Sequence, residues 1–122
     1  MTKQMLKATL YLGASIPSGG MVSPERFADY LTHVTPHFPG FTVMEGHGYW
    51  KGQPEMTRTL VILMEDAPAN RGQIRFFAEQ YKTMFGQESV MHEFQPVEVA
   101  LNCWPYHPNA GIEGVVAVSR LD

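Results

Sequence analysis

Hydrophobic and polar positions alternate in some parts of the chain and recur every three or four residues in others. Alternation predicts a first strand over residues 7–13, with Ala8, Leu10 and Leu12 on one face. Three further strands are expected over residues 41–50, 57–64 and 89–102. The second half of 57–64 is apolar without interruption, which is typical of a strand covered on both faces.

The first helix is predicted from a start signal and an apolar stripe. Ser23 followed by Pro24 places a capping hydroxyl before a proline at the first helical position. Pro36 should end the regular helix near residue 34. The apolar stripe consists of Phe27, Leu31, Val34 and Phe38.

A second helix follows the apolar strand. Asp66 and Asn70 are competing candidates for its N-cap, and Gly86 supplies a left-handed stop. Its apolar stripe consists of Ile74, Phe77, Ala78, Tyr81 and Phe85.

The glycines and prolines between these elements have positional meaning. Gly52 and Pro54 are expected to mark the turn between the second and third strands. Gly46 and Gly48, inside the second strand, indicate a bulge or a close approach of another chain segment.

The element order is strand, helix, strand, strand, helix, strand. This order is typical of the ferredoxin-like α+β fold, βαββαβ, in which two helices cover one face of a four-stranded antiparallel sheet. We expect residues 1–102 to form this domain and residues 103–122 to form a C-terminal arm with a short strand at 114–119, packed on the domain or on a second subunit. The helix-free face would carry Tyr11, Met44 and Trp50, so we expect a second copy or the arm to bury it.

Composition limits the class of protein. Nine Lys and Arg against twelve Asp and Glu give a net charge of −3 over 122 residues, which argues against a general nucleic-acid binder. One cysteine forbids an internal disulfide. Charged residues make up 17% of the chain, below the usual ~25%, and a surface with few charges often contacts another protein. A homo-oligomer is therefore the expected state.

The apolar runs are too short to predict a secretory signal or a membrane-spanning helix. Lys7 interrupts the apolar residues near the start, so no secretory signal is predicted, and the longest apolar run, 60–64, is far below the ~20 residues of a membrane-spanning helix. These features predict a cytoplasmic protein without a membrane partner.

Several ordered motifs resemble one known family. They are Leu10–Gly13, Val34–Val43, Gly46, Gly48, Trp50 and Phe85–Val90. Together they cover about residues 9–102 and resemble a small bacterial family known only as a domain of unknown function. The resemblance implies a shared fold and no established activity.

The stretch from Glu45 to Trp50 is the most suggestive for chemistry. His47 lies between two glycines and could act as an acid or base, oriented by Glu45. The structural interpretation is an edge-strand histidine that faces water beside a glycine-relieved bulge, and without a second catalytic group this interpretation is favoured.

The sequence evidence for an anion site or a metal site is weaker. The loop 15–20 could cradle an anion at the start of a helix, but it lacks both phosphate-loop and dinucleotide spacings, so an ordinary connection is favoured. His33 and His37 have the spacing of helical metal ligands, yet Pro36 separates them, and Cys103 with His107 offers at most half a zinc site. No metal or cofactor is expected.

Three functions remain open. The first is a small-molecule binding protein, acting as a homo-oligomer, whose cleft is lined by Tyr11, His47, Trp50 and Arg58 and whose ligand is anionic or nucleotide-like. The second is a cofactor-independent enzyme that uses a histidine as acid or base, by analogy with dimeric ferredoxin-like proteins. The third is a protein–protein inhibitor. We expect the binding protein, and whether it is also an enzyme stays open.

Overall fold

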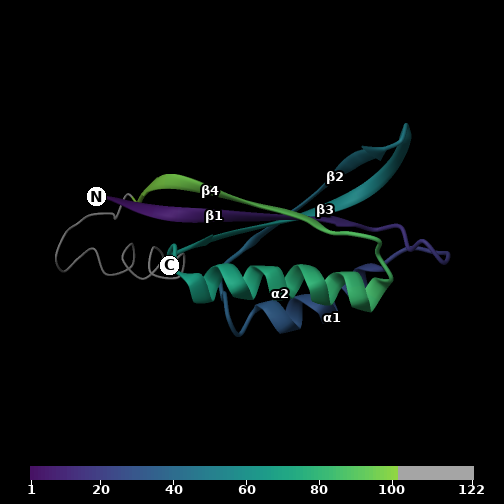
Figure 1. The fold of residues 1–122 in the computed structure, drawn as a ribbon, viewed down its shortest axis with the longest axis horizontal. Coiled ribbons are helices and arrows are strands. Elements are labelled where there is room, and N and C mark those ends of the chain that lie inside the picture. The colour runs from purple at the N-terminus through teal and green to yellow at the C-terminus, as the bar shows by residue number, and fades with distance from the viewer. Residues whose placement is uncertain (102–122) are drawn as a thin grey trace, which may run out of the picture.

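Four strands and two helices follow one another in the order βαββαβ (Figure 1). They are β1 (Thr2–Gly13), α1 (Pro24–Val34), β2 (Thr42–Trp50), β3 (Gln53–Met64), α2 (Pro68–Phe85) and β4 (Met91–Ala100). The structure is a computed structural model that describes residues 1–101. The expected C-terminal arm, 103–122, with its strand at 114–119, lies outside the described residues. Neither described helix is long and apolar enough to cross a membrane.

The four strands form one antiparallel sheet in the order β2-β3-β1-β4. Figure 1 shows both helices below the sheet, on the same face, and the β2–β3 hairpin rising away from them at one end. This is the ferredoxin-like α+β architecture, and the predicted fold class is confirmed.

The core lies between the sheet and the two helices. Alternate residues of β1 and β3 face the helices, because the side-chain period of a strand is two. The fully buried strand residues are Leu6, Ala8, Leu10, Leu12, Leu60 and Ile62. The predicted stripe of α2 is buried in full, whereas in α1 Tyr30 rather than Leu31 is fully buried. The Tyr30 hydroxyl donates to the carbonyl oxygen of Phe77 at 2.9 Å, so its polar atom is satisfied inside the core.

The start of α1 is as predicted. The hydroxyl of Ser23 accepts a hydrogen bond from the backbone N–H of Arg26 at 3.1 Å, and Pro24 occupies the first helical position. The last helical residue is Val34.

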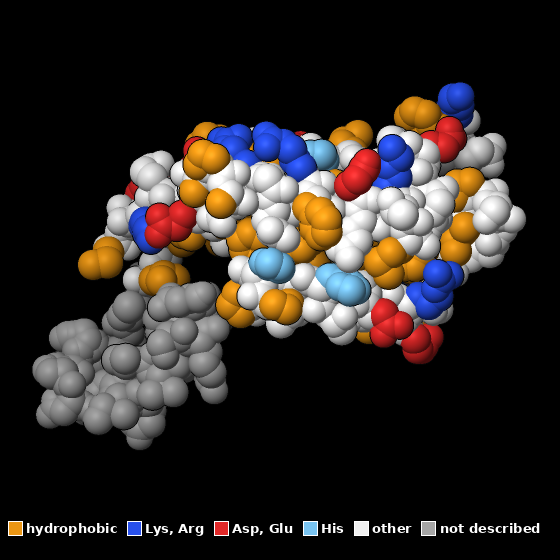
Figure 2. Space-filling view, turned by 60° about the horizontal axis from the view of Figure 1, so that its bottom comes forward, with side chains coloured by type: hydrophobic (Ala, Val, Ile, Leu, Met, Phe, Trp, Pro, Cys, Tyr) orange, Lys and Arg blue, Asp and Glu red, His pale blue; other side chains and the backbone are white. Residues whose placement is uncertain are grey.

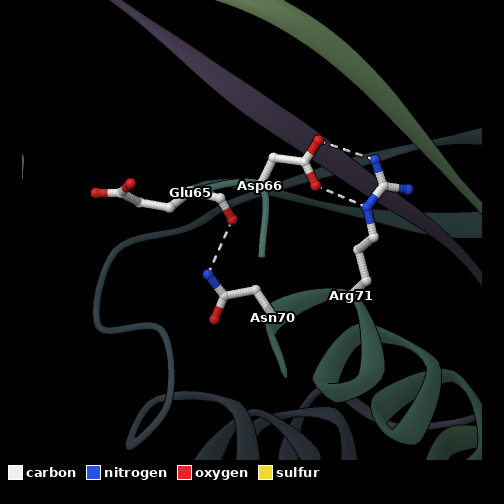
Figure 3. A network of polar contacts seen from close by, with 4 residues as sticks. All are labelled: Glu65, Asp66, Asn70 and Arg71. Carbon is white, nitrogen blue, oxygen red and sulfur yellow. Dashed lines mark hydrogen bonds and ion pairs between the residues drawn. The ribbon is translucent and has the colours of Figure 1, made fainter. Parts of the chain in front are cut away.

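The two N-cap candidates predicted for α2 are wrong, whereas Gly86 is the left-handed C-cap, as predicted. The N-cap is Ala67, which offers no side-chain acceptor, and Pro68 opens the helix. Figure 3 shows what the two polar residues do instead: the Asp66 carboxylate accepts from Arg71 at 2.7 and 3.1 Å, and the Asn70 amide donates to the Glu65 carbonyl oxygen at 2.9 Å. These contacts tie the end of β3 to the first turn of the helix.

The β2–β3 hairpin is tighter than the sequence predicted. The strands are joined by Lys51 and Gly52 alone, both with positive φ (51° and 78°), and Pro54 lies within β3, paired with Tyr49. Two left-handed residues match the twist of a two-residue hairpin. The register is continuous through Gly48, so there is no bulge there. A Cβ at Gly48 would come within 2.8 Å of the Thr57 hydroxyl, which is the close approach that its glycine allows.

The sheet face opposite the helices, which we call the open face, is not covered by any described residue. It mixes exposed apolar side chains, among them Met44, Trp50, Leu63 and Met91, with threonines. The expectation that strand 57–64 is covered on both faces is therefore not met within residues 1–101, since Leu63 is 45% exposed. β4 is one edge strand of the sheet, and Pro96 sits in its middle, opposite Leu6.

Candidate functional site

A cleft of about 690 Å³ lies at one end of the open face, and we call it the hairpin cleft. Its walls come from the last residues of β1, the tip of the β2–β3 hairpin and the connection between α2 and β4. The side chains that matter most for its chemistry are Tyr11, Tyr49, Trp50, Lys51, Glu55 and Met91. A cleft of this size holds a ligand of drug-like dimensions.

Exposed apolar side chains form much of its lining. Tyr49 is 73% exposed, Trp50 69% and Met91 67%. Large exposed aromatic and thioether groups that gather around one cleft are typical of a binding site.

Tyr11 stands on the β1 wall with its ring toward the cleft residues and its hydroxyl engaged. The hydroxyl donates to Oε1 of Glu93 on β4 at 2.8 Å. This hydrogen bond to a carboxylate is the main reason why the pKa of Tyr11 is raised above its usual value of 10.0. Tyr11 is therefore a neutral aromatic wall.

Glu55 is the best-positioned charged group of the cleft. Its Oε2 accepts a hydrogen bond from the backbone N–H of Ser15 at 3.0 Å. The carboxylate lies directly over Gly13, where an added Cβ would stand 2.7 Å from Oε2. The absence of a side chain at residue 13 thus makes the space that the carboxylate occupies.

Two hydrogen bonds hold the β1 wall against α2. The Tyr81 hydroxyl donates to the Gly13 carbonyl oxygen at 2.6 Å, and the Gln87 side-chain amide donates to the Ser15 carbonyl oxygen at 2.9 Å. Burial raises the pKa of Tyr81 to about 12, so this donor is protonated at any physiological pH. The β1 wall, against which the Glu55 carboxylate lies, is therefore held by the helical layer.

The charges that line the cleft are two carboxylates, Glu55 and Glu88, and one ammonium group, Lys51. The Lys51 ammonium lies 5.7 Å from the centre of the Trp50 ring. Arginine is not among the lining residues. An excess of negative charge favours a neutral or cationic ligand over an anionic one.

Of the four residues that the sequence suggested, the structure brings two to the hairpin cleft, Tyr11 and Trp50. Arg58 faces the helices and is 3% exposed. Its guanidinium donates to the Val22 carbonyl oxygen at 2.9 Å and lies 4.9 Å from the centre of the Phe27 ring. These contacts give Arg58 a structural role beneath the hairpin.

His47 also stays outside the cleft. It pairs with Met56 in the β2–β3 ladder, three residues before Trp50, so the two side chains leave opposite faces of β2. Glu45, expected to orient the His47 ring, forms a 3.7 Å ion pair with Arg58 instead. The geometry thus supplies no acid or base partner to His47 among residues 1–101.

The loop 15–20 closes on itself. The amide of Ile16 donates to the Gly20 carbonyl oxygen at 3.0 Å and the amide of Gly19 to the Ile16 carbonyl oxygen at 2.8 Å. The backbone amide of Ser15 donates to the Glu55 carboxylate, so a carboxylate of this same chain occupies the place where an anion was expected. The described residues contain no group of three or more potential metal ligands, and Cys103 and His107 lie outside them.

Sequence reasoning missed Glu55 and Met91 as site residues. The available signal was the position of Glu55 next to Pro54, in a segment assigned to a turn, while the strand in fact begins at Gln53. Its partnership with Gly13 and Ser15 spans 40 residues and depends on the strand register.

Comparison with known proteins gives a family and a fold. The family described as "Protein of unknown function (DUF3574)" matches residues 7–101. No curated protein shows a significant match.

Three solved structures illustrate the likeness in fold. A phage SAM lyase in complex with S-methyl-5'-thioadenosine superposes with a TM-score of 0.62 at 16% identity, over 82% of this chain and 92% of that chain. A phage SAM lyase in the apo state gives 0.56 at 15% identity, over 80% and 90%. A de novo designed protein with a ferredoxin fold gives 0.37 at 8% identity, over 87% and 95%. The first two share the fold of this chain.

Proposed function

The chain belongs to the DUF3574 family of proteins of unknown function, and from the hairpin cleft we propose that it binds a small nucleoside-like molecule that is neutral or positively charged. The observation that carries this proposal is the meeting of two aromatic walls, Tyr11 and Trp50, with a fixed carboxylate, Glu55, in one cleft. Aromatic rings bind the flat face of a nucleobase, and a carboxylate together with a ring face binds a cation.

The charge of the lining narrows the ligand class. Among the anionic and nucleotide-like ligands expected from the sequence, the two carboxylates favour a nucleoside without phosphates. A phage protein of similar fold binds S-methyl-5'-thioadenosine, a neutral adenine thioether, and is called a SAM lyase. We therefore take S-methyl-5'-thioadenosine and the cationic S-adenosylmethionine as the first compounds to test.

The test is titration of each compound into the protein by calorimetry and by tryptophan fluorescence, to which Trp50 and Trp104 both contribute, and the Trp50→Leu variant is compared by calorimetry. We expect saturable binding with a micromolar to millimolar Kd. Trp50→Leu should weaken binding of both compounds, because both stack their base. Glu55→Gln should weaken only the cationic compound, by about tenfold for a lost charge contact of ~1.4 kcal/mol.

Glu45→Gln is the matched control for Glu55→Gln, since Glu45 lies outside the cleft and the change removes the same carboxylate, and His47→Gln is a second control outside the cleft. Equal loss of affinity in the controls and in the cleft variants would contradict the proposed site. The absence of binding for both compounds would contradict the ligand class.

A second candidate function is cleavage of the bound sulfonium compound by elimination. It is favoured by Glu55, a carboxylate fixed by the Ser15 amide inside an aromatic cleft, which would act as the base. Glu55 would remove a proton from the carbon next to the sulfur-bound carbon of the aminobutyrate chain, a C=C bond would form there, and the carbon–sulfur bond would break so that S-methyl-5'-thioadenosine leaves with the electron pair. Incubation with S-adenosylmethionine and chromatography for S-methyl-5'-thioadenosine tests it. Product that disappears in Glu55→Gln would support an enzyme, while binding without product would leave a binding protein.

We further propose that copies of the chain associate through the open face. Support comes from the exposed apolar groups on it, including Met44 and Leu63, which continue toward the cleft at Trp50. Sedimentation velocity should find an oligomer that Leu63→Asp shifts toward monomer. Phe76→Asp, on the helical layer and 57% exposed in the parent chain, is the control that should leave the oligomer intact. A parent chain that sediments as a monomer at all concentrations would contradict this proposal.

A further inference from the structure

A second groove, which we call the α2–β4 groove, lies on the helical side of the sheet and has a volume of about 430 Å³. Its side chains come from one row of α2 and from the first residues of β4 and the loop before it. The lining residues are Arg75, Ala78, Glu79, Lys82, Ser89, Val90 and His92. Figure 2 views the molecule from the helical side and shows Lys and Arg side chains gathered with a histidine along one edge.

Helical spacing explains why the groove is basic. Residues 75, 78, 79 and 82 lie on one face of α2, because positions three and four apart are neighbours on a helix. Ala78 is 5% exposed and forms the apolar floor, and Arg75 and Lys82 stand at the two ends of this row. The groove therefore presents two cations about two helical turns apart.

β4 adds a third group from the opposite wall. The His92 ring lies 6.0 Å from the centre of the Phe94 ring, and the Arg75 guanidinium lies 5.8 Å from the same ring centre. The His92 ring and the Arg75 guanidinium therefore both lie beside the Phe94 ring. The Nδ1 atom of His92 is buried and has no hydrogen-bond partner within residues 1–101. A buried polar atom without a partner calls for a ligand or water in the groove.

The opposing charge in the groove is small. Glu79 is the single carboxylate of the lining, and it makes only a 3.8 Å contact with Lys82. Arg75 forms no ion pair within the described chain, whereas its neighbour Arg71 is paired with Asp66. The groove is therefore net positive in a chain whose net charge is −3.

We propose that the α2–β4 groove binds a phosphate group between Arg75 and Lys82 of α2 and His92 of β4. The guanidinium and ammonium donors form charge-assisted hydrogen bonds to phosphate oxygens, and the hydroxyl of Ser89 offers a further donor. The groove shares Ser89 with the lining of the hairpin cleft but none of its aromatic walls, and it takes ligands of the opposite charge, so this proposal does not rest on the function proposed above.

The test uses the full chain and two probes, inorganic phosphate and ribose 5-phosphate, titrated by NMR. We expect saturable shifts of the His92 ring with both probes if the phosphate alone is recognised, and tighter binding of the ester if the sugar also contacts the groove. Arg75→Gln and Lys82→Gln should each raise the Kd about tenfold, the factor for one charge-assisted hydrogen bond. Both residues are exposed, so the variants keep the fold.

Lys3→Gln removes the same charge far from the groove, where Lys3 pairs with Glu65, and should leave the Kd unchanged. His92→Gln tests the β4 wall separately and should also weaken the binding of inorganic phosphate, because it removes a group that lines the groove. The proposal is overturned if neither phosphate probe saturates, or if Lys3→Gln weakens binding as much as Arg75→Gln.

Discussion

The hydroxyl of Tyr81 on α2 donates a 2.6 Å hydrogen bond to the carbonyl oxygen of Gly13 at the end of β1, across 68 residues of sequence. The same Gly13 lies beneath the Glu55 carboxylate. One buried phenol in the helical layer thus holds the strand end on which the hairpin cleft is built.

Removal of that phenol should destabilise the fold. Tyr81→Phe leaves the ring in the core and deletes the donor, so we expect the free energy of unfolding to fall by about 1–2 kcal/mol in urea titrations. Since the pKa of Tyr81 is raised to about 12 from 10.0, the contribution is complete below pH 10 and is lost as the pH rises toward 12. Tyr49→Phe, which alters an exposed phenol, should change neither quantity. Equal stability of Tyr81→Phe and the parent chain would contradict this role.

Gly13→Ala tests whether the position of the Glu55 carboxylate depends on the missing side chain at residue 13. The added Cβ would stand 2.7 Å from Oε2, so the flexible carboxylate must move and lose its 3.0 Å contact with the Ser15 amide. We expect the affinity for S-adenosylmethionine to fall by about tenfold, with a smaller effect on stability because only the end of a side chain is displaced. Gly40→Ala, where no atom lies near the new Cβ, is the control. Unchanged affinity in Gly13→Ala would contradict the assignment of Glu55 to the binding site.

Arg58→Lys separates structure from binding. The lysine keeps the charge but loses the flat guanidinium that contacts Phe27 and donates to the Val22 carbonyl oxygen. We expect the free energy of unfolding to fall by about 1–3 kcal/mol, as for a weakened buried hydrogen bond to a charged group, and ligand affinity to stay the same. A selective loss of affinity with normal stability would instead restore Arg58 to the ligand site.

The ion pair at the start of α2 predicts a pH dependence. The hydrogen bonds from Arg71 lower the pKa of Asp66 below its usual 3.8, so the paired carboxylate stabilises the fold above that value and the contribution fades as the pH falls through the lowered pKa. Asp66→Asn should therefore have a lower urea midpoint than the parent chain at neutral pH and the same midpoint in strong acid. The difference should be small because the pair is exposed. A difference that persists unchanged in strong acid would contradict this assignment, and Asp29→Asn serves as the control.

Periodicity in the sequence was sufficient for the fold because burial follows it closely. The α2 stripe, the Ser23 cap and the Gly86 stop are local features, and each is found where it was predicted. The N-cap of α2 was mispredicted because Asp66 has a stronger partner in Arg71 than a backbone amide, a contact that composition does not reveal.

The site was only half predictable. Tyr11 and Trp50 were recognised as aromatic groups on the open face, but His47 and Trp50 are an odd number of residues apart and so leave opposite faces of β2. Arg58 lies two residues before Leu60 and four before Ile62, so its side chain leaves the same face of β3 as these core residues. Glu55 was missed because its position depends on a two-residue turn and on a contact with Ser15 that is distant in sequence.

Pro96 in β4 has a consequence for how this sheet can be extended. An edge strand normally offers every second amide to an incoming strand, and a proline in its middle deletes one donor from that row. A neighbouring polypeptide that tried to continue the hydrogen-bonded ladder beyond β4 would meet this gap halfway along. Addition of a strand along β4 is thereby hindered, whereas β2, the edge strand at the opposite border, contains no proline.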